Sequence, residues 1–347
     1  MNIYYYWFIG EIIFIIFFFS FILFKVRQKT KSKSTKIPET LSQKIKYYIQ
    51  YVFRIIGFGL SVFFVLGIII TIERTFLSII TETAPAPSEV NIPNDLGFEV
   101  QEITFESEDG ITLSGWFTPP QNNATIILLH GYGGNRTGMI WHAQQLTQHG
   151  YGVLMYDERA SGESTGEYRS YGWEDTQDVK AAIQFLTSQN ANENIGALGC
   201  SIGASIAVYS TALYPQIDAV WGDGNSSVRA QDLSTPKNIF MAFIIASNYL
   251  LDWMYTIKLN IDAPAPLSDV IQEIEPRPLM LVGGGIEHPI MGSEADLFTL
   301  RFYELAGSNA QVWVIPEATH CDGPFVIPDE YSKRMIQFFD EAFNITR

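Results

Sequence analysis

Two long apolar runs with almost no charge dominate the N-terminal part of the chain. Residues 3–24 hold a single charge, at Glu11, and residues 55–72 hold none. At about 1.5 Å of rise per residue, each run forms a helix near the ~30 Å length of a membrane span. The segment 25–46 between them is rich in Lys and Arg, which is typical of cytoplasmic loops. We therefore expect residues 1–74 to form a transmembrane hairpin, with the rest of the chain outside the cytoplasm.

A cleaved signal peptide is the alternative for residues 3–24. Such a peptide has positive charge before its apolar region and small residues at a cleavage site after it. Here the positive charges follow the apolar run, and no A-x-A pattern comes directly after it. The sequence therefore favours an anchor that is retained.

The pattern changes after the second apolar run. Residues 75–97 include a stretch rich in Pro and acid without periodicity, which is typical of a linker. From Phe98 onward, short apolar runs alternate with longer amphipathic ones. The predicted strands cover residues 98–107, 111–117, 125–130, 152–157, 195–199, 219–223, 278–283 and 311–316. The predicted helices cover residues 137–149, 174–189, 202–213, 294–306 and 328–343.

This alternation predicts an α/β domain over residues 98–347. Nearly continuous apolar strands are typical of a mostly parallel sheet with helices on both faces. Functional side chains then lie in loops at the carboxyl ends of the strands. Residues 224–277 exceed the length of a minimal crossover and contain an apolar helix candidate at 239–255. We interpret this segment either as a cap over the active site or as an ordinary helix that covers the sheet.

Composition narrows the class of partner. The 347 residues carry a net charge of -15 at pH 7, although basic residues outnumber acidic ones in residues 1–74. The remainder is therefore strongly acidic and would repel the phosphates of a nucleic acid. Two cysteines are too few for a disulfide framework, and no spacing resembles a zinc site. We expect neither a metal nor an organic cofactor.

The segment Gly199-Cys200-Ser201-Ile202-Gly203 fits the pattern G-x-S-x-G. It follows a predicted strand and opens a predicted helix, which is the strand–turn–helix setting of a nucleophile elbow. A serine there stands above the sheet with its hydroxyl at a helix N-terminus. The alternative is that Ser201 only caps this helix. The context favours Ser201 as a nucleophile.

A glycine-rich loop, His130-Gly131-Tyr132-Gly133-Gly134, follows the predicted strand 125–130. Such a backbone can direct N–H groups at a developing oxyanion. The expected donors are the main-chain N–H groups of Tyr132 and Ile202. We expect His130 itself to be structural.

His320 follows the predicted strand 311–316 and precedes the last predicted helix. A neutral imidazole there can take the serine proton and return it to the leaving group. The acid that orients the imidazole should follow the preceding strand, where Glu287 is the natural choice. Glu294 and Asp296 are the alternatives, because both come shortly after it.

Together these motifs resemble the α/β-hydrolases, in particular a bacterial membrane-anchored branch related to dienelactone hydrolases and S9-type peptidases. The resemblance covers roughly residues 98–345. It rests on the segments DGITLSGWFTPP, LLHGYGGN, YDERASGES, GCSIGA, Pro278–Pro289, and ATH followed by PDEY. It implies a catalytic triad of Ser201, Glu287 and His320. It also implies an oxyanion hole formed by Tyr132 and Ile202.

Two departures from the family pattern are visible. The family usually has Arg-Gly-x-Gly where this chain has Arg159-Ala160-Ser161-Gly162. It usually has Asp, commonly just before Pro, where this chain has Glu287-His288-Pro289. Glu is chemically able to orient an imidazole, so the expected mechanism is kept.

The sequence thus predicts a membrane-anchored serine hydrolase. It would cleave an ester-like acyl substrate, small or lipid-like, through an acyl-Ser201 intermediate. One alternative is an S9-like peptidase, although the long propeller that often filters peptides in that group is missing from the sequence. A second alternative is a non-catalytic binding module with the same fold.

Overall fold

A computed structural model describes residues 40–190, 194–233, 235–236, 238–286 and 297–346. The chain divides into two compact units, Met1–Ile69 and Ile70–Arg347. Helix α2 (Leu41–Thr83) begins in the first unit and ends in the second.

Helix α2 is long and strongly apolar. Its most apolar window has a mean hydropathy of 2.7, and 6% of that window is buried. Within the described residues, it is the one helix long and apolar enough to cross a membrane. The predicted span 55–72 lies inside it, whereas the predicted span 3–24 lies outside the described residues. The two-helix hairpin therefore stays a prediction.

The helix extends beyond the predicted span at both ends. It begins within the basic segment predicted as a loop and continues past Glu73 and Arg74 to Thr83. Two charges do not end a helix, and residues 73–83 contain neither Gly nor Pro. The helix stops just before Ala84-Pro85, where the proline restricts the preceding backbone.

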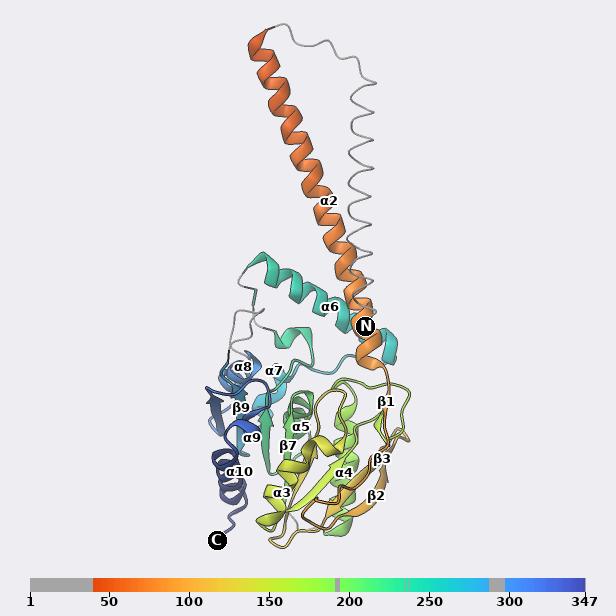
Figure 1. The fold of residues 1–347 in the computed structure, drawn as a ribbon, viewed down its shortest axis with the longest axis vertical. Coiled ribbons are helices and arrows are strands. Elements are labelled where there is room, and N and C mark those ends of the chain that lie inside the picture. The colour runs from red at the N-terminus through yellow and green to blue at the C-terminus, as the bar shows by residue number, and fades with distance from the viewer. Residues whose placement is uncertain (1–39, 191–193, 234, 237, 287–296, 347) are drawn as a thin grey trace. The chain divides into compact units, whose positions relative to one another are not determined.

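One mixed sheet forms the centre of the second unit (Figure 1). In the described residues it has eight strands in the order β10-β9-β8-β7-β4-β5-β3-β2. Strand β3 is antiparallel to β2 and β5, and the other neighbours are parallel. The strands are β2 (Gln101–Glu106), β3 (Thr112–Thr118), β4 (Ala124–Leu129), β5 (Gly152–Tyr156), β7 (Asn194–Cys200), β8 (Ala219–Asp223), β9 (Leu279–Gly284) and β10 (Ala310–Ile315). The predicted mostly parallel sheet is confirmed, with small shifts at the strand ends.

Helices cover both faces of this sheet. Alternate side chains of β4 show the two layers, because Ile127 and Leu129 pack with α4, α5 and α8, whereas Ile126 and Leu128 pack with α3 and α10. Burial on both faces explains why this strand is continuously apolar. The α-helices of this unit are α3 (Ile140–Gln148), α4 (Asp175–Gln189), α5 (Ile202–Leu213), α6 (Ile239–Leu259), α7 (Leu267–Val270), α8 (Leu297–Leu305), α9 (Gly323–Val326) and α10 (Pro328–Phe343). The 3-10 helices are η1 (Arg136–Met139), η2 (Ala230–Asp232) and η3 (Ile271–Ile274).

The stretch predicted as a linker contacts the sheet domain. Its two-residue strand β1 (Ala86–Pro87) pairs in parallel with β6 (Ser161–Gly162). Further along, Val90 and Leu96 are buried in the domain. These contacts depend on residues far away in the sequence, so local periodicity gives no sign of them.

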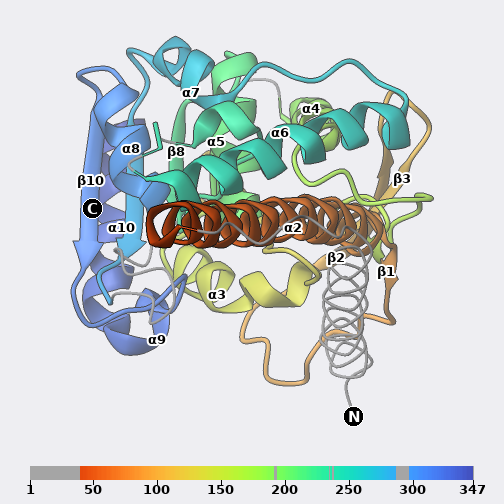
Figure 2. The ribbon, with the colours of Figure 1, turned by 90° about the horizontal axis from the view of Figure 1, so that it is seen from above.

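Helix α6 contains the apolar helix predicted at 239–255. Its C-terminal half is fixed by an ion pair from Asp252 Oδ2 to Arg229 Nε, 3.0 Å long, and by Tyr255, which stacks on Trp173 with ring centroids 5.1 Å apart. Viewed from above, α6 runs across the domain (Figure 2). Its role as a cap stays a prediction.

Candidate active site

Ser201 occupies the sharp turn between β7 and α5. Its backbone has φ 60 and ψ −122, a left-handed conformation that strains a residue with a Cβ atom. The Ser201 N–H donates to the Asp223 carbonyl at 2.8 Å, which ties the turn to the end of β8. A strained serine between a strand and a helix is the geometry expected of a nucleophile elbow.

Both glycines of the pentapeptide are required by close backbone contacts. A Cβ on Gly199 would come within 2.2 Å of the Gly203 carbonyl oxygen. A Cβ on Gly203 would come within 2.4 Å of the His130 carbonyl oxygen. The elbow therefore packs directly against the end of β4, where the glycine-rich loop begins.

His320 lies beside Ser201. Its Nε2 is 2.9 Å from Ser201 Oγ, a distance suited to proton transfer between the two side chains. The imidazole edge faces Gly224, where a Cβ would come within 2.9 Å of His320 Nδ1. Asp322 shapes the same loop by accepting hydrogen bonds from the Thr319 N–H and hydroxyl, each 2.6 Å long. The structure thus brings together the predicted nucleophile and base.

The glycine-rich loop also reaches Ser201. A Cβ on Gly131 would lie 3.4 Å from Ser201 Cβ. Tyr132, one of the two expected donors, is the residue directly after Gly131. Ile202 is the first residue of α5. Its N–H therefore belongs to the first turn, where N–H groups have no acceptor within the helix. The two expected donors thus belong to residues next to Ser201 or to Gly131, and their role as an oxyanion hole stays a prediction.

The His130 side chain fixes the start of this loop by hydrogen bonds at both ring nitrogens. Its Nδ1 bonds the Gly131 carbonyl at 2.9 Å, so Nε2 is the acceptor for the Glu158 N–H at 3.1 Å. Burial lowers the pKa of His130 and keeps the ring neutral. Burial, together with Asp175 and Asp178, raises the pKa of the Glu158 carboxyl well above its ordinary value. With both ring nitrogens engaged, His130 has the geometry of a structural residue.

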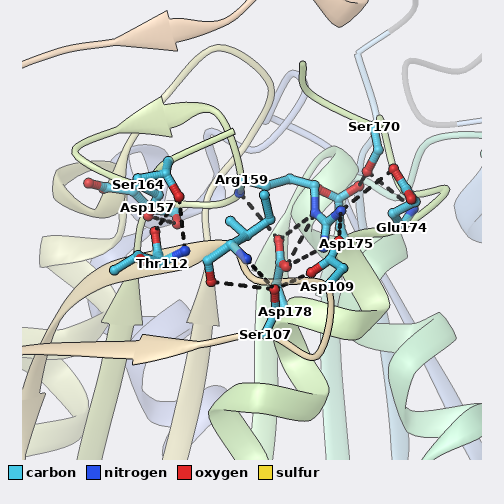
Figure 3. Close-up of polar contacts among 12 residues, drawn as sticks. Ser107, Asp109, Thr112, Asp157, Arg159, Ser164, Ser170, Glu174, Asp175 and Asp178 are labelled. Atoms are coloured by element: carbon cyan, nitrogen blue, oxygen red, sulfur yellow. Dashed lines mark hydrogen bonds and ion pairs between the residues drawn. The ribbon is translucent and has the colours of Figure 1, made fainter. Parts of the chain in front are cut away.

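Buried ion pairs fix the loop that follows β5 (Figure 3). Arg159 Nη2 contacts Asp178 Oδ1 at 2.6 Å, and its Nη1 contacts Asp109 Oδ2 at 2.9 Å. The next residue, Ala160, has φ 55, at the position where the family that the sequence resembles usually has glycine. Breaking such a buried pair costs about 3–5 kcal/mol. Arg159 is therefore fixed directly before the left-handed turn at Ala160.

The acid expected to orient His320 cannot be placed. Glu287, with the alternatives Glu294 and Asp296, lies outside the described residues. The loop that carries Glu287 nevertheless starts next to the His320 loop, since the Ile286 N–H donates to the Ala318 carbonyl at 3.1 Å. The assignment of Glu287 stays a prediction.

Asp223 is a site residue that sequence reasoning missed. Its carbonyl accepts from the Ser201 N–H and from the Cys321 Sγ, and its Oδ2 accepts from the Tyr331 hydroxyl at 2.7 Å. Burial and the Asp223 charge raise the pKa of Tyr331 well above its ordinary value, so the hydroxyl stays a donor. The one sequence signal was the position of Asp223 at the end of a predicted strand.

Within the part of the chain that the structure describes, no three His, Cys, Asp or Glu side chains are grouped to hold a metal ion. The expectation that the protein uses no metal or organic cofactor stays a prediction.

Comparisons with known proteins support the fold. A family model described as serine aminopeptidase, S33 (Hydrolase_4) matches residues 120–284. The chain is 28% identical over 260 residues to the uncharacterized protein YfhR of Escherichia coli O157:H7, covering 71% of this chain and 83% of YfhR.

Two solved structures are similar in fold. Esterase Pf2001 of Pyrococcus furiosus has 25% identity and a TM-score of 0.58, with 74% of this chain and 97% of the esterase covered. The alpha/beta hydrolase GrgF of Penicillium sp. sh18 has 16% identity and a TM-score of 0.54, with 71% and 99% covered. At 16% identity, the second likeness shows the fold alone.

Proposed function

Because the chain is a member of the α/β-hydrolase superfamily, we propose that it is a serine hydrolase that cleaves an ester-like acyl substrate. The observation that supports this proposal most directly is the 2.9 Å contact from His320 Nε2 to Ser201 Oγ at a strained elbow. The esterase named above, a structural neighbour, supports an ester over other acyl substrates.

The proposed reaction has two halves. Ser201 Oγ attacks the acyl carbon and its proton passes to His320 Nε2, while the N–H groups of Tyr132 and Ile202 stabilise the oxyanion. The carbon–oxygen bond to the leaving alkoxide then breaks, and His320 returns the proton to that oxygen. Water, deprotonated by His320, attacks the acyl-Ser201 ester and releases the acid and the free serine. Glu287 is proposed to orient the imidazole through Nδ1.

A peptidase is the second candidate function. It is favoured by the description of the matching family model, serine aminopeptidase. Amides need a protonated amine as leaving group, which the same His320 would supply. Parallel assays of p-nitrophenyl esters and aminoacyl p-nitroanilides distinguish the two candidates by kcat/KM.

We also propose that the protein is anchored in a membrane, with its catalytic part outside the cytoplasm. Helix α2 supports this proposal by its length and by its mean hydropathy of 2.7 in the most apolar window. The basic residues that precede it favour a cytoplasmic start of the span. The second span at residues 3–24 belongs to the same proposal.

Helix α6 is the proposed cap that contacts the acyl chain. It is apolar over most of its length, yet the fixed contacts of Asp252 and Tyr255 lie in its C-terminal half. The N-terminal half, which includes the partly exposed Ile244, is the part proposed to cover an apolar substrate.

The decisive experiment is covalent labelling of the full-length protein in mild detergent with a fluorophosphonate probe. We expect the wild type to be labelled and Ser201→Ala not to be, because only an activated serine attacks the probe. Ser188→Ala, at an exposed serine of α4, is the matched control and should be labelled like the wild type. A folded wild type that takes no label would instead support the non-catalytic binding module.

A further inference from the structure

The glycine-rich loop after β4, which we call the oxyanion loop, has one side chain at its tip that can hold it in place. Between His130 and Asn135 the sequence is Gly-Tyr-Gly-Gly, so Tyr132 is the only residue there with a side chain. The Tyr132 hydroxyl donates to the Thr81 carbonyl at 2.9 Å, near the C-terminal end of α2. The position of the loop therefore depends on the end of this helix.

Arg169 joins the same two elements. Its guanidinium lies 4.3 Å from the centroid of the Tyr132 ring, and Nη2 donates at 3.0 Å both to the Tyr132 hydroxyl and to the Thr81 carbonyl. Its Nε donates to the Ala84 carbonyl at 2.5 Å, and its main-chain N–H donates to the Thr83 carbonyl at 3.1 Å. One arginine thus bonds three carbonyls at the end of α2 and stacks on the loop.

These contacts suit the chemistry of a helix end. The last carbonyls of a helix lack partners within the helix, and a cation is favourable beside them. The planar guanidinium donates in several directions and stacks on a ring at the same time, which an ammonium cannot do. Arg169 therefore couples the end of α2 to Tyr132 more firmly than a lysine would.

The last turn of α2 also contacts helix α6. Glu82 Oε2 accepts a hydrogen bond from the Tyr255 hydroxyl at 2.7 Å. Burial raises the pKa of Glu82, and the bond from Tyr255 and the charge of Arg169 partly oppose this. A movement of this turn would therefore move both the oxyanion loop and α6.

We propose that the C-terminal turn of α2 is part of the active-site framework, with Arg169 as a positioning residue that holds Tyr132 so that its N–H faces the oxyanion. This inference rests on the proposed function. Helix α2, which we propose as the membrane anchor, would then also affect the rate of turnover.

Two variants of the full-length protein in detergent test the proposal. Tyr132→Phe keeps the backbone N–H and the ring and removes only the hydroxyl. Arg169→Gln removes the stacking and most of the bonds to α2. Loss of an oxyanion donor costs roughly 10²–10³ in kcat, so a misplaced donor should cost less. We expect kcat for p-nitrophenyl butyrate to fall about 3–10-fold in Tyr132→Phe and about 10–100-fold in Arg169→Gln, with little change in KM.

Active-site titration separates positioning from folding. Each kcat is divided by the fraction of protein that fluorophosphonate labels to completion, so unfolded protein does not count. Affinity for a boronic acid that mimics the oxyanion should fall in parallel with kcat. Arg169→Lys, which keeps the charge over the ring, should recover part of the loss. Arg334→Gln is the matched control, because Arg334 also stacks on a ring, 4.4 Å from the Trp313 centroid, but on α10.

The outcomes distinguish this inference from the proposed function. Wild-type kcat per titrated site in both variants would overturn the inference and leave the hydrolase proposal intact. An unlabelled wild type would overturn the proposed function and the inference with it. A loss in Arg334→Gln equal to that in Arg169→Gln would also overturn the inference, because it would show a general effect of removing an arginine that stacks on a ring.

Discussion

His142 is a histidine buried in the sheet domain. It lies on α3, packed against Trp141 and Tyr331 with ring centroids 5.3 Å and 5.9 Å away. Neither ring nitrogen has a hydrogen-bond partner among the described residues. Burial lowers the pKa of His142 from 6.5 to about 4, so the folded protein keeps the ring neutral.

This histidine predicts a pH dependence of stability. Below pH 6.5, His142 is protonated in the unfolded chain, whereas in the folded protein it stays neutral until the pH falls to about 4. The pKa of His142 is lower in the folded protein than in the unfolded chain. The neutral, buried ring therefore contributes its full stability above pH 6.5, and this stability is lost as the pH falls towards 4. The loss is on the order of 3 kcal/mol. We expect the stability of His142→Phe relative to wild type to rise by that order between pH 6.5 and pH 4, measured by urea unfolding.

His149→Phe is the matched control for this prediction. His149 follows the same helix, but it is only partly buried and its Nδ1 bonds the Gln145 carbonyl at 2.8 Å. Parallel stability curves for wild type and His142→Phe across this pH range would contradict the prediction.

Single residues also show how far the sequence leads. Ser201 and His320 were predicted from motifs, and the structure places them in contact. Asp223 and Arg169 were missed because their roles come from carbonyl and ring contacts that no local motif encodes. For Arg169 the partners lie 85 and 88 positions away in the sequence.

Among the elements, α6 allows a test of the proposed cap. If its N-terminal half covers the acyl chain, a charge there should penalise each buried methylene group of a long substrate. Burial of one such group contributes about 0.8 kcal/mol. We expect Ile244→Asp to lower kcat/KM for p-nitrophenyl laurate at least tenfold more than for the butyrate.

Ile257→Asp gives the matched control. Ile257 lies in the C-terminal half of α6 and is 60% exposed, against 37% for Ile244. It should leave the ratio of laurate to butyrate turnover unchanged. Equal losses on both esters in Ile244→Asp, in step with a lower Tm, would remove the support for a cap.

Strands were predicted better than helix ends. Apolar runs predicted the central strands of the large sheet, because burial on both faces leaves a strong local signal. Strands β2 and β3 were predicted from alternation on either side of Asp109-Gly110. The C-terminal end of α2 and the pairing of Ala86–Pro87 with Ser161–Gly162 were not predicted. Those depend on packing between segments distant in sequence, and a two-residue strand has no periodicity.

For the molecule as a whole, the proposed membrane topology makes a sharp prediction. In sealed right-side-out vesicles, added protease should remove a tag at the C-terminus. Leu60→Asp with Phe63→Asp should protect that tag, since each Asp at the centre of a span costs roughly 2.5–3.5 kcal/mol and α2 would then fail to cross. Both residues are exposed in the structure, as lipid-facing side chains would be.

Ile80→Asp is the control for topology. It places a charge on an exposed face of the same helix, beyond the apolar window predicted at 55–72. Its tag should stay accessible. A wild-type tag that is protected until the vesicles are opened would contradict the extracytoplasmic placement.

The boundary of the catalytic unit differs from the one expected at Phe98. The compact unit begins at Ile70, because Ile79, Val90 and Leu96 are all buried in it. Composition suggested a linker there, and composition cannot show that a polar stretch is packed along a domain.

The order of the chain also sets the earliest point in synthesis at which the proposed activity can arise. Ser201 precedes His320 by 119 positions, and the base arrives only with the loop after β10, the last strand of the sheet. A ribosome that has made Ser201 must still add three strands before His320, the proposed proton acceptor, is present. Chains released before that point lack the proposed base and should be inactive in the proposed reaction.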